Sequence, residues 1–574
     1  MLNKIKIPQI NPLECLLFIF AFIFSFWLMF STFSYEKGVI QIGAKAWSDF
    51  ASHIPVIRSF SFGSNFPPEY ALFPGEPMRF HFLFYALVGL LEKIGIPLNY
   101  ALNIPSAIGF LGLLVMIYIF AKQIFNSISV GIISVILFLF NGSLSFIEFF
   151  KTHPLSITAI NEIISNKVFP SFGPYDGKTV AAFWNLNIYT NQRHLGLSYG
   201  LSLLLIYILI NPIFSRNHMH DRPIKMPKML KWFLGEKIDF SSKFLLKNVL
   251  LGSLLGSFFY LHLGVFTFTI IIIGVLALLF RQLRFPTIII FIIGFIFSFP
   301  QYLYQYNHTS TFSFLVKPGY LIDINKLSFI SFTDYWFMNL GIPLVLLSCG
   351  FVFAPVKLKK IFLAFFSLFI IGNLFQFSPE IAGNHKFFNF FMICGVTFAS
   401  YFLTKLWKKN IAVKSIVVVA IFFSVLSGII DFFPIYNDSK ITLADYPINP
   451  DVKWIKDNTP KDSVFLNTQY LYNPASIAGR KIFLGWPYFA WSAGYDTDER
   501  DRIRRSLLNS NNLTQFCNDS RKYKINYVEI NNHDEYDYPI NNLFFEENFP
   551  RAYGTRENLI SIYDVNMSCD RKGS

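Results

Sequence analysis

One polar stretch of the sequence, from Trp47 to His81, contains most of the residue types that group transfer requires. A carboxylate can act as a general base, and cations can bind an anionic leaving group. Aromatic residues separate the charges, which indicates packing against the protein or a membrane surface, with an ordinary solvated loop as the alternative. Five prolines and two glycines predict that the stretch is not one continuous helix. Its ionisable residues are Asp49, His53, Arg58, Glu69, Glu76, Arg79 and His81.

Two other polar segments could add cations to the same site. The segment 187–194 (NIYTNQRH) and the segment 380–386 (EIAGNHK) each end in two basic side chains. Each alone could be an ordinary loop, but on the same side of a membrane they would meet the first stretch. Asp49 would then be a general base while the cations hold a phosphate leaving group. The expected anion-binding group consists of His53, Arg79, His81, Arg193, His194, His385 and Lys386.

The composition excludes an ordinary soluble protein. Hydrophobic residues make up 53% of the 574 residues and charged residues only 15%, whereas soluble domains carry about 25% charged residues. The net charge of +14 could indicate nucleic-acid binding. However, the basic residues lie mostly in short runs between apolar segments, where they set membrane topology. We therefore expect a lipid bilayer as the partner and no nucleic acid.

Apolar segments recur from residue 13 to residue 434 and predict a mainly α, polytopic membrane protein. The segment 82–96 is shorter than the roughly 20 residues of a membrane span. If it does not cross, the count is 11 spans, and if another crossing is hidden, the count is 13. The sequence leaves both open.

Basic residues predict the orientation of these spans. The N-terminus, MLNKIKIPQINPLE, is basic and precedes about 20 apolar residues, so we expect an uncleaved first span with a cytoplasmic N-terminus. Basic clusters at 216–247, 281–284, 357–360 and 405–409 are expected on the cytoplasmic side. The first loop (34–81), the loop 149–194, the turn 379–386 and the C-terminal region then lie outside. The expected location is the plasma (inner) membrane.

The composition changes after residue 436, which predicts two units: a transmembrane catalytic domain (1–436) and an extracytoplasmic α/β domain (437–574). Helices are expected at 450–458 and 498–509, and strands at 463–467, 481–485, 525–530 and 559–565. Cys517 and Cys569 could pair if this region is extracytoplasmic. The absence of C-x-x-C and H-E-x-x-H motifs leaves no indication of a metal or other cofactor, although a divalent metal is possible.

Two stretches carry a family resemblance: WSDFASHIPVIRSF…PPEYALFPGEPMRFHFLFYAL and AGRKIFLGWPYFAWSAGYD (478–496). Together with the plan of spans, first loop and outer domain, they resemble the GT-C superfamily of integral membrane glycosyltransferases. Its members include protein O-mannosyltransferases, aminoarabinose transferases and the catalytic subunit of oligosaccharyltransferase. The resemblance implies a sugar donor on a polyprenyl phosphate and an acceptor glycan, lipid or protein. It also implies that Asp49 activates the acceptor in an inverting transfer on the outer face.

The sequence departs from the superfamily in one respect. Many members have paired acids in the first loop, whereas Asp49 has Ser48 and Phe50 as neighbours. A second acid could come from Glu69, Glu148 or Asp176. The aromatic segment LGWPYFAWSAGYD is either a sugar-binding loop or part of a domain core. Weaker candidates for acceptor or sugar contacts are Glu69, Trp486 and Asp496.

Three other functions fit parts of the pattern. A lipid-linked saccharide flippase or transporter would favour charges within the spans and symmetry between halves, whereas the charges here gather at one face and no internal repeat is visible. A polysaccharide polymerase gives no reason for a C-terminal α/β domain. A scaffold role is the remaining alternative.

Overall fold

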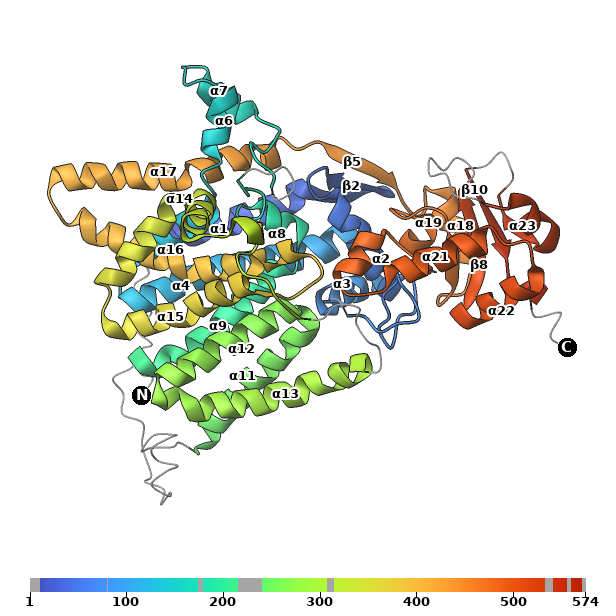
Figure 1. The fold of residues 1–574 in the computed structure, drawn as a ribbon, viewed down its shortest axis with the longest axis horizontal. Coiled ribbons are helices and arrows are strands. Elements are labelled where there is room, and N and C mark those ends of the chain that lie inside the picture. The colour runs from blue at the N-terminus through green and yellow to red at the C-terminus, as the bar shows by residue number, and fades with distance from the viewer. Residues whose placement is uncertain are drawn as a thin grey trace, which may run out of the picture.

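The computed structural model describes residues 11–79, 81–173, 179–214, 240–306, 314–531, 540–554 and 559–569. A bundle of apolar helices forms the larger part, and a smaller region of mixed helices and strands lies at its end (Figure 1). The helices α2 (Trp47–Ser61) and α3 (Leu83–Lys93) lie between the two parts. The first loop of the sequence therefore occupies the junction.

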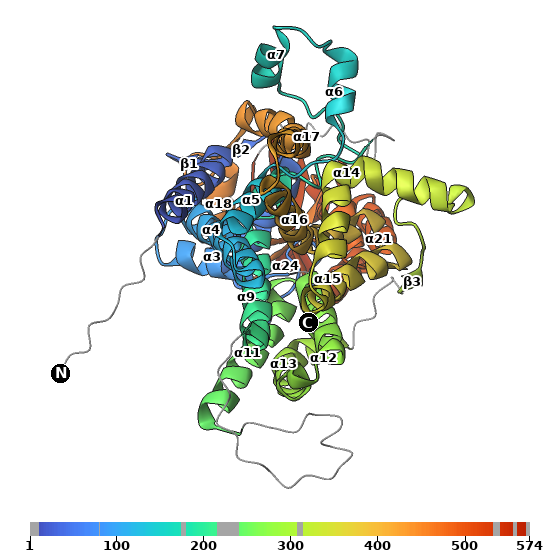
Figure 2. The same ribbon diagram turned by 90° about the vertical axis from the view of Figure 1, so that its left-hand side faces the viewer.

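Within the described residues, eight helices are long and apolar enough to cross a membrane. They form a bundle that Figure 2 shows from one end. Two further apolar helices are shorter, α5 (Ile128–Leu139) and α12 (Leu263–Leu279), and α15 (Val356–Leu374) begins with lysines. The chain is an integral membrane protein. The eight long helices are α1 (Pro12–Thr32), α4 (Leu98–Phe125), α9 (Leu195–Phe214), α11 (Ser242–Leu261), α13 (Arg284–Tyr306), α14 (Phe329–Phe353), α16 (His385–Trp407) and α17 (Ile411–Tyr436).

The short helix α3 bears on the number of spans. It has 11 residues, which at 1.5 Å per residue extend only about 16 Å, roughly half the hydrocarbon thickness. Helix α5 is nearly as short, with 12 residues. Both predicted counts, 11 and 13 spans, stay predictions.

The helices α4 and α9 pack with their backbones in close contact. A Cβ atom at Gly109 would lie 2.8 Å from the backbone nitrogen of Leu197, and one at Gly200 would lie 3.1 Å from that of Leu113. Small residues permit this approach, on which helix association in lipid depends. The contact fixes the start of α9, and with it His194, close to the first loop.

The first loop begins with a hairpin and continues as a buried helix. The strands β1 (Phe33–Glu36) and β2 (Val39–Gly43) pair, and β2 also pairs with β5 (Lys440–Ala444) after the last span. The prolines and glycines confine helix α2 to the first half of the polar stretch, although Pro55 lies within it. Burial of Phe50, Ile54 and Ile57 stabilises α2 and offsets the hydrogen bond that Pro55 cannot donate.

The C-terminal region contains a five-stranded sheet in the order β7-β6-β8-β10-β9. The predicted helices are found as α18 (Pro450–Asn458) and α21 (Thr497–Leu508). The predicted strands are found as β6 (Val464–Asn467), β7 (Lys481–Ile482), β8 (Ile525–Asn531) and β10 (Ile560–Asp564), with β7 shorter than expected and β9 (Arg551–Tyr553) as an additional edge strand. A disulfide between Cys517 and Cys569 joins α22 (Leu513–Tyr523) to α24 (Asn566–Cys569).

The C-terminal region is anchored to the first loop by backbone and charge. The N–H of Ile482 donates to the carbonyl of Ala71 at 3.0 Å, and that of Gly485 donates to Leu72 at 2.9 Å. The fully buried Arg58 on α2 pairs with Asp445. The loop is thus held from both sides, and the division into units 1–436 and 437–574 stays a prediction.

Candidate active site

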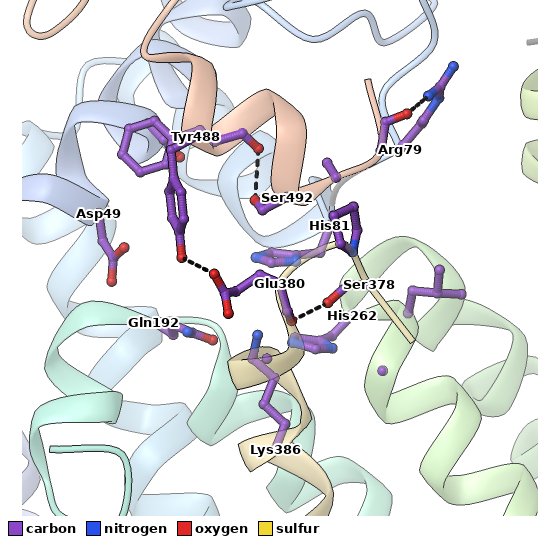
Figure 3. A pocket seen from close by; sticks show the side chains of 18 of the residues that line it. Asp49, Arg79, His81, Gln192, His262, Ser378, Glu380, Lys386, Tyr488 and Ser492 are labelled. Atoms are coloured by element: carbon purple, nitrogen blue, oxygen red, sulfur yellow. Dashed lines mark hydrogen bonds between the residues drawn. The ribbon is translucent and has the colours of Figure 1, made fainter. Parts of the chain in front are cut away.

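A cavity of about 930 Å³ lies where the first loop, the helix bundle and the C-terminal region meet (Figure 3). All three polar segments singled out from the sequence line it, with Asp49, Gln192 and Lys386 as examples. The three segments therefore lie on the same side of the membrane. Further lining residues come from the junction of α11 and α12, the end of α13, the segment 377–383 and α20 (Pro487–Ser492).

Asp49, in the first turn of α2, presents a free carboxylate to this cavity. It is half-buried, and it has no hydrogen-bond or ion-pair partner among the residues that the structure describes. Burial raises the pKa of Asp49 to about 6, while the positive charge of Lys386 acts in the opposite direction. A carboxylate of this pKa is mostly ionised at neutral pH and is more basic than an ordinary one. It therefore suits a general base.

Lys386 and Glu380 lie across the cavity from Asp49 (Figure 3). The ammonium group of Lys386 forms no ion pair within the described part of the chain, and its backbone carbonyl accepts a hydrogen bond from the Tyr199 hydroxyl at 3.0 Å. The carboxylate of Glu380 accepts from the backbone N–H of Ala382 at 3.0 Å and from the Tyr488 hydroxyl at 3.4 Å. Glu380 is a second carboxylate that sequence reasoning missed, although it begins the EIAGNHK segment.

Histidines form a second group around the cavity. His81 and His262 line the cavity, and His194 packs behind them with its ring centroid 3.8 Å from that of His81. His53 stacks on Tyr85 at 4.6 Å. Burial lowers the pKa of His53 to about 3 and that of His81 well below its usual value. These two imidazoles are therefore neutral at pH 7, and they would meet a ligand as hydrogen-bonding or metal-binding groups rather than as charges.

His262 was not identified from the sequence. The residue stands alone between the apolar segments that form α11 and α12, and its Nδ1 accepts the N–H of Val265 as the N-cap of α12. A single capping histidine gives no functional signal in a sequence. Only the fold shows that it lies beside His81, with ring centroids 4.9 Å apart.

Arg193 does not belong to the cavity, contrary to the arrangement expected from sequence. Its guanidinium is fully buried in the bundle and donates to the carbonyls of Thr190 and Met29, at 2.8 and 3.3 Å. It also donates to Asn103 and Thr32 on α4 and α1. These contacts use the donors that an anion would need. Arg193 therefore anchors the start of α9. Among the described residues that line the cavity, Lys386 is the cation without an ion-pair partner.

The other expected site residues divide between the cavity and the scaffold. Arg79, His385 and Trp486 line the cavity. Arg79 also donates to Glu76, and the His385 ring stacks on Phe183 at 4.7 Å.

The remaining acids are occupied elsewhere. Glu69 pairs with Lys481 at 2.7 Å, Glu148 pairs with Lys151 at 2.7 Å, and Asp496 caps α21 by accepting from the N–H of Glu499. Asp176 lies outside the described residues. Within the described part, the acids that line the cavity are thus Asp49 and Glu380.

Comparison with known proteins finds no matching family model and no matching curated protein. Among solved structures, the chain resembles the arabinofuranosyltransferase AftD from Mycobacteria with a TM-score of 0.51 and 12% sequence identity. The similarity covers 96% of this chain and 41% of that chain. The chain has the GT-C fold. It spans less than half the length of AftD.

A second solved structure is also similar, the oligosaccharyltransferase of Archaeoglobus fulgidus tethered to an acceptor peptide that contains an NVT sequon. The similarity covers 90% of this chain and 69% of that chain, with 11% sequence identity and a TM-score of 0.44. The GT-C fold of AftD confirms the predicted fold class, a mainly α, polytopic protein with a C-terminal α/β region. At 12% identity the likeness concerns the fold alone.

Proposed function

We propose that the protein is a membrane glycosyltransferase that moves a sugar from a polyprenyl-phosphate carrier to an acceptor on the outer face of the membrane. The observation that carries the proposal is a pair of opposite charges, Asp49 and Lys386, that lie on different elements of one 930 Å³ cavity and have no ion-pair partner among the described residues. A base and a phosphate-binding cation are what such a transfer needs. The GT-C fold supports the same class of reaction.

The transfer follows from this geometry as a single displacement. Asp49 accepts the proton of an acceptor hydroxyl or amide, and the acceptor atom attacks the anomeric carbon. The bond between that carbon and the phosphate oxygen breaks, and its electron pair stays on the oxygen. The products are the glycosylated acceptor, with inverted anomeric configuration, and the free lipid phosphate. The proton on Asp49 then passes to water.

The leaving phosphate gains one negative charge in this step. Lys386 stabilises that charge more strongly than the original phosphodiester, which lowers the barrier. The rings of His53, His81 and His385 line the same cavity and can donate hydrogen bonds to phosphate oxygens. Arg193 is left out of this group because its guanidinium is occupied inside the bundle.

The helix α20 and its N-cap residue Trp486 provide an aromatic wall for the sugar or the acceptor. Trp486 and Tyr488 both line the cavity and are 37% and 38% exposed. Aromatic rings that are half-exposed at a cavity offer flat apolar surfaces with a polar edge. We assign sugar or acceptor contact to these residues, and Asp496 is replaced in this role because it caps α21.

The outer-face orientation rests on two features. The basic clusters expected in the cytoplasm include Lys357 on α15 and Lys405 on α16, and both lie at the helix ends opposite the cavity segment 375–386. The disulfide between Cys517 and Cys569 fits an oxidising compartment. We therefore assign the N-terminus to the cytoplasm and the cavity to the outside of the plasma membrane.

The decisive experiment measures transfer of labelled sugar from a panel of polyprenyl-phosphate sugars by the full-length protein purified in detergent. We expect turnover with at least one donor and loss of turnover in Asp49→Asn. The matched control is Asp498→Asn, which changes an exposed carboxylate on α21. Full activity of Asp49→Asn contradicts the base assignment. Absence of turnover with every donor, combined with passage of lipid-linked sugars across vesicle membranes, indicates a flippase instead.

A further inference from the structure

Three histidines from separate segments meet beside the cavity. His81 precedes α3, His194 precedes α9, and His262 joins α11 to α12. Their ligand nitrogens all lie within 4.8 Å of one another. The proposed transfer gives no reason for three imidazoles to converge at one point, since a phosphate could be held by groups spread over the cavity.

The second observation is that two of these rings have buried nitrogens without partners. The Nε2 atoms of His194, which is fully buried, and of His262, which is 5% exposed, accept or donate no hydrogen bond among the described residues. Buried polar atoms in proteins are nearly always satisfied. A ligand that takes imidazole nitrogens would satisfy both atoms.

We propose that His81, His194 and His262 bind a divalent transition metal ion, with Zn²⁺ as the first candidate. Imidazole is a preferred ligand of such ions, and three protein ligands with one open position are typical of reactive zinc centres. Zinc–nitrogen bonds of about 2.0–2.1 Å place tetrahedral ligands roughly 3.4 Å apart. Small side-chain rotations that move each ring nitrogen by about 1 Å therefore bring nitrogens that lie within 4.8 Å of one another to this spacing.

The groups around two of the rings determine which nitrogen binds the metal. The Nδ1 atom of His194 lies 2.9 Å from the hydroxyl oxygen of Tyr85. When Nδ1–H donates to this oxygen, the lone pair of Nε2 is free for the metal, as second-shell partners of metal-bound histidines commonly arrange. In His262, Nδ1 accepts from the N–H of Val265 at 3.3 Å. Binding through the lone pair of Nε2 requires the ring proton to move to Nδ1, which can then no longer accept, so this long hydrogen bond is lost.

The surrounding charges both oppose and favour a cation. The ammonium of Lys386 is close enough to act on all three rings, and it repels a second cation. The carboxylates of Asp49 and Glu380 line the same cavity and attract one. An anion bound to the three histidines would reverse this dependence, so the effect of Lys386 on binding distinguishes the two kinds of ligand.

The fourth coordination position would open toward the cavity, because His81 and His262 both line it. If the proposed glycosyl transfer is correct, a phosphate oxygen of the lipid donor can occupy this position, where the metal would stabilise the leaving group together with Lys386. This extension depends on the proposed function. The metal site itself does not.

The test uses the full-length protein in detergent, stripped with a chelator and titrated with Zn²⁺ in the absence of donor. We expect one equivalent of Zn²⁺ per chain and, with Co²⁺ as the probe, the visible absorption of a four-coordinate ion. His194→Ala and His262→Ala should weaken Zn²⁺ binding at least a hundredfold. His153→Ala, which removes a histidine outside the cavity, is the matched control and should bind Zn²⁺ normally.

Two further variants keep all three imidazoles and therefore guard against misfolding of the alanine variants. Tyr85→Phe should weaken Zn²⁺ binding tenfold to a hundredfold by removing the partner of His194. Lys386→Met should strengthen it about tenfold by removing the opposing charge. Zn²⁺ retention by the wild type no greater than that of His194→Ala overturns the proposal. So does weaker Zn²⁺ binding in Lys386→Met, because removal of a positive charge beside a metal site should strengthen the binding of a cation.

Failure of this proposal and failure of the proposed function give different results. Asp49→Asn should bind Zn²⁺ with unchanged stoichiometry while transfer is lost. A chain that binds no metal but still transfers sugar retains the function and loses the metal site. A chain that binds metal but transfers no sugar retains the metal site and loses the proposed function.

Discussion

The two halves of helix α2 differ in whether their charges have partners. In the second half, which contacts the C-terminal region, Arg58 pairs with Asp445, and Glu69 further along the loop pairs with Lys481. In the first half, which faces the cavity, Asp49 has no partner within the described residues.

This difference separates positioning residues from residues that act on substrate. A buried ion pair adds little net stability, but loss of one partner is costly because the other charge remains buried. An unpaired, desolvated carboxylate destabilises the fold and is retained where chemistry needs it. Substitutions in the paired half should therefore change stability, and those in the unpaired half should change turnover.

The largest effect is expected for Asp49→Asn. Loss of a general base should lower the transfer rate about a thousandfold. Because the folded-state pKa of Asp49 is raised to about 6, its ionisation costs stability as pH rises from its unfolded pKa through 6. At pH 8 the variant should thus be at least as stable as the wild type, by thermal unfolding in detergent. Loss of turnover that accompanies a lower unfolding midpoint would place Asp49 among the structural residues.

Arg58→Ala tests the paired half. Removal of the guanidinium leaves the fully buried Asp445 without its partner, which should lower the free energy of unfolding by about 3–5 kcal/mol. Denaturation in detergent measures this change. Arg502→Ala, which removes a cation from an exposed pair with Glu499, is the control and should have little effect. Unchanged stability in Arg58→Ala would show that this junction is not held by charge.

Lys386→Met tests the cation that lies across the cavity from Asp49. Without the ammonium group, the charge on the leaving phosphate is less stabilised, and kcat should fall about a hundredfold, or roughly 2.7 kcal/mol. Lys151→Met changes an exposed lysine on α6 (Phe146–Thr152) and should leave kcat unchanged. A rise in KM at constant kcat would instead indicate that Lys386 binds the ground-state donor.

The pH dependence of transfer tests the same base without a substitution. Asp49 is active as a carboxylate, and its pKa of about 6 means that the active form is lost as pH falls through 6. The value of kcat/KM should therefore fall about tenfold between pH 7.5 and pH 5. A profile that is flat over this range would contradict the raised pKa. The unfolding midpoint, measured across the same range, separates inactivation from acid unfolding.

Much of the fold could be predicted from sequence because its signals are local. Apolar runs mark the spans, and the pattern of DVKWIKDN predicts the helix found as α18 (Pro450–Asn458). The pattern of residues 525–530 likewise predicts the strand found as β8 (Ile525–Asn531). The number of spans stays a prediction, 11 or 13, because α3 and α5 are both shorter than a full crossing.

The site was less predictable because its contacts are not local. Arg193 and Lys386 are both basic residues at the start of a span, and the sequence does not distinguish them. Arg193 is occupied by groups on α1 and α4, whereas the Lys386 ammonium faces a cavity. His262 is one polar residue between two apolar segments, and only the packing of α11 and α12 brings it beside His81.

The smallest effect is expected for Trp486→Ala, at the border between the two kinds of residue. Trp486 belongs to the C-terminal region, but it lines the cavity and is 37% exposed. If it contacts sugar or acceptor, its removal should raise KM about fivefold to tenfold, roughly 1 kcal/mol, with kcat and stability nearly unchanged. Trp407→Ala, at the far end of α16 and 49% exposed, is the control. A loss of stability without a change in KM would assign Trp486 to the scaffold. The residues that contact substrate would then belong to the first loop and α16.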